Sequence, residues 1–286
     1  MRKLLPVSIV VLVALAIFVV PAFAITGNWV KDFEHPFVGL VVYYDADGEF
    51  VWRCSGSLIS PTKFVTAGHC SDTGEGAVSA RVYFQQDAGA NYDPATQVDP
   101  VSGYPEYCAA GTEGVSCATS DEIYNYGFAN FAGFPNTRDA GLVILDQPIT
   151  LPEYGVLPAP GILDDLDTAR GTQDTLFTVS GYGLTKRVSA NSALSNISYR
   201  IRLMASSTLV NLVSKNTDGY NLQTQGNGDG RGGTCSGDSG GPVFLGGPES
   251  NTIVAVTSFG MNSLCRGTDY GYRIDRPEVL DWINSH

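Results

Sequence analysis

Short apolar runs separated by turn residues dominate this chain. They predict strands over residues 37–59, 64–70, 80–84, 140–145, 176–180, 199–203, 242–245 and 253–257. Within the first run, Asp45-Ala46-Asp47-Gly48 is typical of a β-hairpin turn. Residues 277–283 show the pattern of a short helix with Pro277 in its first turn. We therefore expect an all-β chain that ends in a short helix.

The first residues have a different pattern. A basic start is followed by a nearly unbroken apolar stretch over residues 7–20 and then by small residues at Ala22 and Ala24. This order predicts a secretory signal peptide over residues 1–24, although the length of the apolar stretch leaves an uncleaved membrane anchor open. Four prolines within residues 148–161 mark a crossing between two units, which we place at residues 25–155 and 156–286.

Composition narrows the class. The 286 residues include 33 glycines and 15 prolines, and only 16% are charged, which favours short strands joined by turns. The net charge of −12 makes the chain a poor match for nucleic acid or for an anionic membrane. Six cysteines predict three disulfides in a secreted protein and leave fifteen pairings open. We expect no metal, because there is no C-x-x-C pair or histidine cluster, and the turn at residues 226–230 reads as a plain loop rather than a calcium site.

One run has the composition of a nucleophile loop. In Thr234-Cys235-Ser236-Gly237-Asp238-Ser239-Gly240-Gly241-Pro242, Ser239 stands among glycines and directly follows an acid. A serine hydroxyl becomes a useful nucleophile only when a base removes its proton and backbone donors stabilise the developing oxyanion. Glycines allow the sharp turn that exposes such N–H groups. The run predicts acyl-transfer chemistry at Ser239.

The base and its orienting acid are selected from few candidates. Of the three histidines, His286 ends the chain and His35, before Pro36, reads as a turn or surface residue, which leaves His69. The acid should be buried and should fix one imidazole tautomer. Asp139 stands at the start of an apolar strand, whereas Asp146 at its far end reads as a turn residue.

In chain order, His69, Asp139 and Ser239 lie in motifs that resemble those of the trypsin/chymotrypsin family of serine proteases. The chain has T-A-G-H-C, D-A-G-L-V-I-L and G-D-S-G-G-P where the family has T-A-A-H-C, D-I-A-L-L and G-D-S-G-G-P. Likewise C-S-G-S-L-I resembles C-G-G-S-L-I, V-S-G-Y-G resembles V-T-G-W-G, and S-F-G resembles S-W-G, so the resemblance spans about residues 25–283. It implies two six-stranded antiparallel β-barrels of chymotrypsin type with a short C-terminal helix. The first would carry His69 and Asp139, and the second Ser239 and the specificity pocket.

The resemblance also implies an activity. The chain would be a secreted, monomeric serine endopeptidase that cleaves protein or peptide substrates through an acyl-enzyme intermediate, without a cofactor. Gly237 and Ser239 would form the oxyanion hole. The implied substrate-binding residues are Gly233, Ser258, Gly260 and Asp269. The implied disulfides are Cys54–Cys70 and Cys235–Cys265, which leave Cys108 and Cys117 for a third bridge.

Family members are activated when a new N-terminus pairs with the acid that precedes the nucleophile. Here those residues would be Ile25 and Asp238. No propeptide separates Ala24 from Ile25, so we expect removal of the signal peptide itself to yield the active form.

Specificity and function each leave an alternative. The resemblance places Gly233 where the family has the aspartate that gives a preference for basic substrate residues. We therefore expect either a chymotrypsin-like or broad substrate preference, or a preference for basic substrate residues through Asp269. The chain departs from the family at Gly68 and at Phe259, which could reshape the substrate groove. An α/β-hydrolase would need its histidine after the serine, where only His286 stands. A catalytically silent binding module on the same fold is the remaining alternative.

Overall fold

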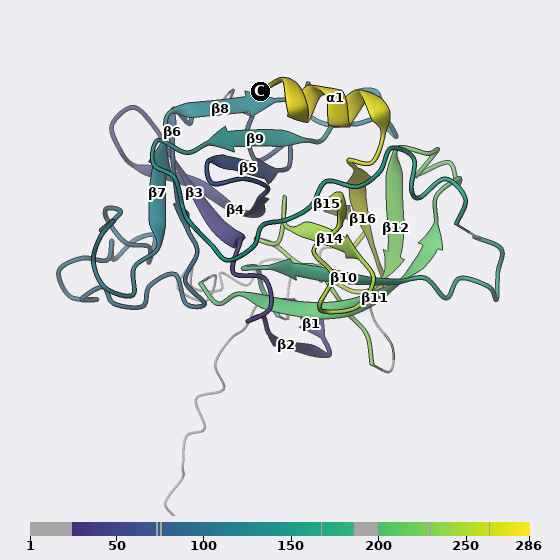
Figure 1. Cartoon of the computed structure of the whole chain (residues 1–286), viewed down its shortest axis with the longest axis horizontal. Helices are drawn as coiled ribbons and strands as arrows, with labels where there is room; N and C mark the ends of the chain where they lie inside the picture. The colour runs from purple at the N-terminus through teal and green to yellow at the C-terminus, as the bar shows by residue number, and fades with distance from the viewer. Residues whose placement is uncertain are drawn as a thin grey trace, which may run out of the picture.

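The structure, a computed structural model, describes residues 25–72, 74, 76–166, 168–185, 200–226, 228, 230–262 and 264–286. Two barrel-like sheets lie beside each other, and helix α1 (Pro277–Ser285) packs at one end (Figure 1). This arrangement confirms the predicted all-β, two-barrel fold with a short C-terminal helix. The predicted signal peptide lies outside the described residues, as do Asn227 and Asp229 of the turn at 226–230.

The first sheet contains seven antiparallel strands in the order β7-β6-β3-β4-β5-β9-β8. Their bounds are Val38–Tyr44 (β3), Phe50–Leu58 (β4), Lys63–Thr66 (β5), Ser79–Tyr83 (β6), Cys117–Ser120 (β7), Glu122–Asn125 (β8) and Gly141–Ile144 (β9). The predicted hairpin is the β3–β4 pair, and its turn closes where the Gly48 amide donates to the Asp45 carbonyl at 3.1 Å. Every side chain of β3 is buried, and each large apolar side chain there contributes roughly 1.5–3 kcal/mol.

The second sheet follows the order β10-β14-β15-β16-β12-β11-β2, and a further β10–β11 pairing closes six of its strands into a barrel. The bounds are Trp29–Lys31 (β2), Leu176–Gly181 (β10), Leu203–Asn211 (β11), Asn221–Gln225 (β12), Pro242–Leu245 (β14), Ile253–Gly260 (β15) and Thr268–Arg273 (β16). Each sheet thus has seven strands where six were expected, because short edge strands also pair.

The N-terminal segment pairs with strands from the second half of the chain and not with the first sheet. Strand β1 (Thr26–Gly27) pairs with β13 (Gly232–Gly233), and β2 pairs with β11. All strands of the first sheet precede residue 155. The unit boundary between residues 155 and 156 stays a prediction.

The strand predicted over 199–203 is displaced. Tyr199 lies outside the described residues, Ile201 forms only an isolated bridge with Asp87, and β11 begins at Leu203. Arg202 leaves the ladder because its buried guanidinium is held by the carbonyls of Val38 and Phe84 at 3.0 and 2.9 Å. A buried cation satisfied by carbonyls is a tertiary feature that an apolar pattern does not reveal.

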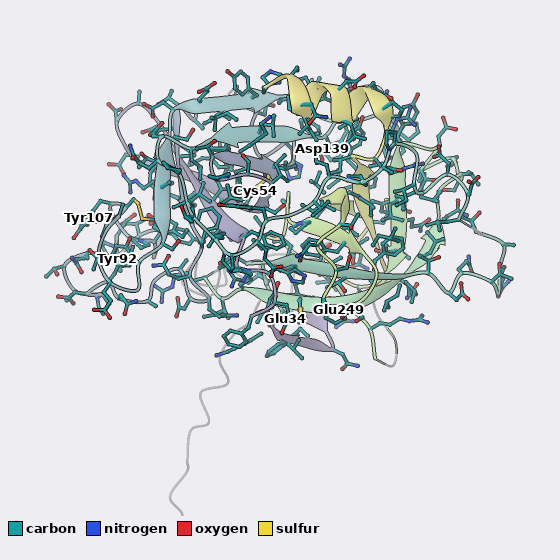
Figure 2. The ribbon with its side chains drawn as sticks, viewed as in Figure 1. Glu34, Cys54, Tyr92, Tyr107, Asp139 and Glu249 are labelled. Carbon is teal, nitrogen blue, oxygen red and sulfur yellow. A yellow bond between two sulfur atoms is a disulfide. The ribbon has the colours of Figure 1, made fainter. Side chains whose placement is uncertain are left out.

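A long segment without regular strands connects β6 and β7. Its Cys108–Cys117 bridge joins it to the start of β7, and Tyr92, visible with Tyr107 in Figure 2, packs edge-on against Tyr83 at 6.4 Å. The other two disulfides are Cys54–Cys70 and Cys235–Cys265. All three pairings are those expected from the sequence.

Candidate active site

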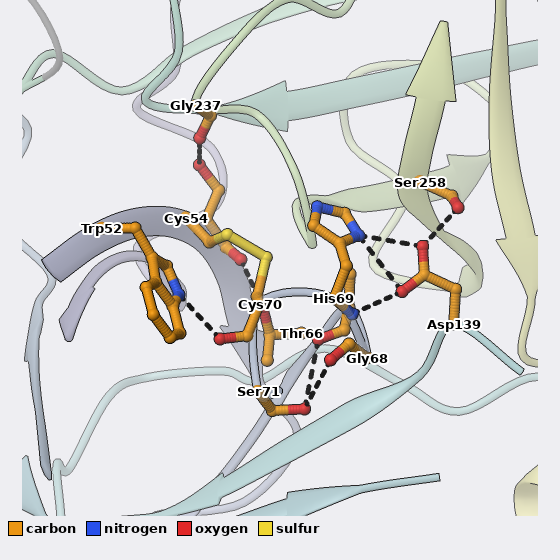
Figure 3. Close-up of a disulfide and its surroundings, with 12 residues drawn as sticks. Trp52, Cys54, Thr66, Gly68, His69, Cys70, Ser71, Asp139, Gly237 and Ser258 are labelled. Carbon is orange, nitrogen blue, oxygen red and sulfur yellow. Dashed lines mark hydrogen bonds and ion pairs between the residues drawn. A yellow bond between two sulfur atoms is a disulfide. The ribbon is translucent and has the colours of Figure 1, made fainter. Parts of the chain in front are cut away.

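His69 follows β5 and is fixed to the buried carboxylate of Asp139. Its backbone amide donates to Asp139 Oδ1 at 2.7 Å, and its Nδ1 lies 2.9 Å from Oδ2. The imidazole side chain is 24% exposed, while Asp139 is fully buried. Figure 3 shows the Nδ1 edge of the ring facing Asp139 and the opposite edge turned away from it. The neighbouring Cys54–Cys70 bridge fastens this loop to β4.

The carboxylate of Asp139 also accepts a short hydrogen bond from the Ser258 hydroxyl. Burial raises the pKa of Asp139, but the charge and hydrogen bonds of His69 and the bond from Ser258 outweigh burial, so this pKa lies below its ordinary value. Burial lowers the pKa of His69, but the charge of Asp139 and its hydrogen bond to the ring together outweigh burial, so the His69 pKa lies above its ordinary value. The pair therefore favours an imidazolium once a proton arrives.

The loop that contains Ser239 turns sharply at Gly237, whose φ is +97°. This left-handed conformation favours glycine because a Cβ would strain it. Asp238 is fully buried behind the loop, and its carboxylate accepts from the amides of Cys235 at 2.9 Å and Gly183 at 2.7 Å. Ser239 remains partly exposed. The buried acid thus holds the loop from behind while the serine faces outward.

Ser239 lies where two cavities meet. The larger, of about 730 Å³, is lined by His69, Ser239 and Ser258, with Phe128 and Phe131 on one side. The smaller is lined by Ser239, Ser258 and Asp269. Among the described residues, no hydrogen bond links Ser239 Oγ to His69 Nε2. Such bonds in unliganded sites are often long and tighten only around substrate. The structure thus brings His69 and Ser239 to one cavity, and it hydrogen-bonds His69 to the buried Asp139.

Asp269 lies in the smaller cavity, which has about 230 Å³. Its Oδ2 accepts from the Thr234 amide at 2.9 Å. Gly233 makes room for it, since a Cβ there would lie 2.3 Å from the same oxygen. Burial raises the pKa of Asp269 to about 6, against the Thr234 hydrogen bond. Gly260, also predicted as a pocket residue, is exposed and lines the same cavity.

Aromatic rings cover one side of both cavities. Phe259 stacks on Tyr270 at 4.5 Å, and the rings of Phe131 and Phe134 each stand edge-on to Phe259 at 5.7 Å. Phe131 is 38% exposed and has a positive φ of 61°, which is costly for a bulky residue. The sequence marked Phe259 only as a departure from the family and gave no signal for Phe131 or Phe134, because their proximity depends on the fold.

Ile25 is fully buried, and its backbone amide donates to the Asp238 carboxylate. Burial raises the pKa of Asp238 to about 7, and the charge of Asp269 adds to the rise, while the hydrogen bonds from Cys235, Gly183 and Ile25 lower it. The pairing of Thr26 with Gly233 holds this segment beside a glycine that lies directly against Asp269. The predicted partners Ile25 and Asp238 are therefore in contact.

The expectation that His35 is a turn or surface residue is wrong. His35 is fully buried, its Nδ1 lies 2.9 Å from Asp32 Oδ2, and its ring stacks on Phe244 at 4.3 Å. The sequence placed it before a proline, but packing from distant strands encloses it.

One cluster within the described residues has metal-ligating atoms close together: those of Cys54, His69 and Cys70 lie within 4.8 Å of one another. The two sulfur atoms are joined in a disulfide, which removes the thiolates that a metal would bind.

The Trypsin family model matches residues 26–283, so this chain belongs to the trypsin family of serine proteases. Brachyurin of Leptuca pugilator is 31% identical over 242 residues, which cover 82% of this chain and 88% of brachyurin. The CLIP domain-containing serine protease B10 of Anopheles gambiae is 27% identical over 168 residues, or 57% of this chain, and the match spans only 43% of that relative. The solved structure of HL collagenase matches with a TM-score of 0.61 at 20% identity and covers 91% of this chain and 97% of that one, a likeness of fold.

No helix in the described part of the chain is both long and apolar enough to cross a membrane.

Proposed function

We propose that this protein is a secreted serine endopeptidase. Ser239 Oγ attacks the carbonyl carbon of a peptide bond while His69 Nε2 accepts its proton, and the amides of Gly237 and Ser239 donate to the resulting oxyanion. His69 then gives the proton to the leaving amine as the C–N bond breaks, which leaves an acyl-enzyme. A water molecule, deprotonated by His69, releases the acid and restores Ser239. Asp139 orients the ring and stabilises its charged form.

A single observation supports this proposal most. The imidazole of His69 is fixed by Asp139 at 2.9 Å through one nitrogen, while its other edge belongs to the cavity that Ser239 also lines. A base held in one tautomer beside an exposed serine is the arrangement that acyl transfer requires. Three disulfides and the predicted signal peptide support secretion.

A fluorophosphonate probe tests the activity. We expect the purified secreted protein to be labelled at Ser239 and to hydrolyse casein, and Ser239→Ala to do neither while it unfolds at the same temperature as wild type. A wild-type protein that binds peptides but resists the probe would instead establish the silent binding module. The intact His69–Asp139 pair disfavours that alternative.

We propose that the active form begins at Ile25. A free ammonium there would neutralise Asp238, whose desolvated charge costs roughly 4 kcal/mol at neutral pH. Because burial raises the pKa of Asp238, a protein in which Asp238 has no ammonium partner loses folding stability as the pH rises from about 4 to about 7. Sequencing the N-terminus of probe-labelled protein checks this proposal, and active enzyme with any other first residue contradicts it.

We further propose that Asp269 gives a preference for lysine or arginine before the scissile bond. A buried carboxylate with a pKa of about 6 is ionised at neutral pH, and a substrate cation would offset its desolvation. We expect the ratio of kcat/KM for a lysyl over a leucyl substrate to fall as the pH drops below about 6. Because the protonation of His69 affects both substrates equally, it does not change this ratio. Asp269→Ala should remove the preference, and an unchanged cleavage profile would establish the apolar or varied specificity instead.

The aromatic side of the groove supports a second preference. The rings of Phe131 and Phe134 flank Phe259 and are 38% and 43% exposed, so they can pack against a large apolar side chain of the substrate. Peptides with such a residue near the scissile bond should be cleaved faster than serine-containing ones. Phe131→Ser should shrink this difference and leave the Lys/Leu ratio unchanged.

A further inference from the structure

Ser55 joins the nucleophile loop of one barrel to the histidine-bearing side of the other. It lies in β4, is fully buried, and directly follows Cys54, whose bridge to Cys70 fastens the His69 loop. Its backbone amide donates to the Ser239 carbonyl at 2.7 Å. Its hydroxyl donates to the Gly237 carbonyl at 2.8 Å.

The same hydroxyl is also an acceptor. The Tyr182 amide of the second barrel donates to Ser55 Oγ at 2.9 Å. On the other side, the Thr66 hydroxyl donates to the Ser55 carbonyl at 2.8 Å. All polar groups of Ser55 are thus engaged. The motif C-G-G-S-L-I, which this stretch resembles, has glycine at this position and could not provide the hydroxyl.

Four successive carbonyls in the nucleophile loop accept hydrogen bonds, and two of these bonds come from Ser55. The Ser236 carbonyl accepts from the Leu184 amide at 3.0 Å, and the Asp238 carbonyl accepts from the Gly241 amide at 2.8 Å. Those two peptide groups contain the N–H groups of Gly237 and Ser239. The peptide between them contains the Gly237 carbonyl, which the Ser55 hydroxyl holds.

We infer that Ser55 is a positioning residue that sets the two oxyanion donors relative to each other and to His69. Gly237 has no side chain to limit rotation of its peptide groups, so the bond to its carbonyl restricts that rotation. The N–H of the Gly237–Asp238 peptide donates to the Cys235 carbonyl at 3.0 Å, so the Ser55 hydroxyl fixes the opposite, carbonyl side of this peptide. If the bond from Ser55 is removed, the peptide can tilt about its remaining contact, and the two N–H groups no longer converge on one oxygen. This role rests on the proposed protease function.

The test compares Ser55→Ala with Ser57→Ala. Ser57 is two residues along the same strand, equally buried, and its hydroxyl has no hydrogen-bond partner. Both variants lose one buried oxygen, but only Ser55→Ala releases the loop. We expect Ser55→Ala to lower kcat about tenfold with little change in KM, which corresponds to one lost hydrogen bond.

A pair of inhibitors separates oxyanion stabilisation from general damage. A peptide aldehyde forms a tetrahedral adduct with Ser239, whereas the matching peptide alcohol occupies the groove without one. In Ser55→Ala the inhibition constant of the aldehyde should rise about tenfold and that of the alcohol should not change. Ser57→Ala should leave both constants at their wild-type values. If Ser55→Ala does not fold, Ser55→Gly, the residue of the family motif, replaces it.

The outcomes distinguish this inference from the proposed function. A wild-type protein that the fluorophosphonate probe does not label overturns both. A labelled wild type with equal aldehyde inhibition of wild type, Ser55→Ala and Ser55→Gly overturns the role of Ser55 alone. Equal losses for aldehyde and alcohol would also overturn it, because they would indicate a disturbed groove rather than misplaced donors.

Discussion

Within the part of the chain that the structure describes, two Asp–His pairs have almost the same internal geometry. In each, the carboxylate accepts from the backbone amide of the histidine and lies 2.9 Å from its Nδ1, namely Asp139 with His69 and Asp32 with His35. Each carboxylate also accepts a serine hydroxyl, from Ser258 or from Ser180. The two pairs differ only in what surrounds the ring.

The surroundings decide what each histidine can do. The Nε2 of His35 lies 3.2 Å from the Ser250 carbonyl, and the ring is fully buried against Phe244. His69 is 24% exposed and lines a cavity together with Ser239. An Asp–His pair is therefore not itself a catalytic signature. A general base needs a nitrogen that is free to accept a proton and a substrate that can reach it.

Removal of His69 should have the largest effect. We expect His69→Ala to lower kcat/KM by about 10⁴-fold or more, because the proton of Ser239 then has no acceptor. The variant should still fold, because the buried Asp139 keeps its hydrogen bonds from the His69 backbone amide and from the Ser258 hydroxyl. Peptide hydrolysis and thermal unfolding measure the two effects, with the exposed His286→Ala as the control. A His69→Ala variant with substantial activity would mean that His69, like His35, is not the general base.

Removal of Asp32 should produce the opposite result. Asp32→Ala leaves His35 and the nearby Arg202 buried without their carboxylate and should cost about 3–5 kcal/mol of unfolding free energy. Burial raises the pKa of Asp32, but the contacts of His35, Ser180 and Arg202 lower it overall. The contribution of Asp32 is therefore present above its ordinary pKa and is lost as the pH falls.

Urea unfolding at several pH values measures this contribution, and titration of active sites gives kcat per folded molecule. We expect kcat to stay at the wild-type value, and the stability difference to shrink in acid. The exposed Asp47→Ala is the matched control. A fall in kcat per active site comparable to that of His69→Ala would mean that the buried Asp32–His35 pair takes part in the reaction.

The smallest expected effect is a shift in titration. Since the charge of Asp139 raises the pKa of His69, kcat/KM should rise with a midpoint above 6.5, as the neutral imidazole forms. Asp139→Asn should lower the pKa of His69, and Asp32→Asn should leave it unchanged. NMR titration of labelled histidines resolves both rings. A pKa of His69 that is the same in wild type and in Asp139→Asn would contradict the contact between His69 and Asp139.

The sequence predicted the His69–Asp139 pair correctly, but it misplaced His35 of the fully buried His35–Asp32 pair, for a physical reason. His69, Asp139 and Ser239 stand in local motifs that survive as linear patterns. His35 becomes buried through Phe244 and Ser250, more than 200 residues away, and no local pattern records that contact. The strand predicted over 199–203 was displaced by the buried Arg202 for the same reason.

Other features of the fold and of the site could not be predicted from the sequence, because they also depend on contacts between distant segments. Strand β12 is polar in sequence, and its residues join the ladder only because β11 and β16 flank it. The disulfides were predicted through the family resemblance, whereas the contacts of Ser55 depend on the approach of two barrels that the sequence does not position.

The pairing of β1 with β13 and of β2 with β11 has a practical consequence for dividing this protein into fragments. A cut between residues 155 and 156 would leave the second half without the strands that cover Gly233 and the edge of β11. A peptide of residues 25–36 supplied separately would have to complete that half. Reconstitution of the second half alone should therefore need this short peptide, which restores the strands beside Gly233 and β11.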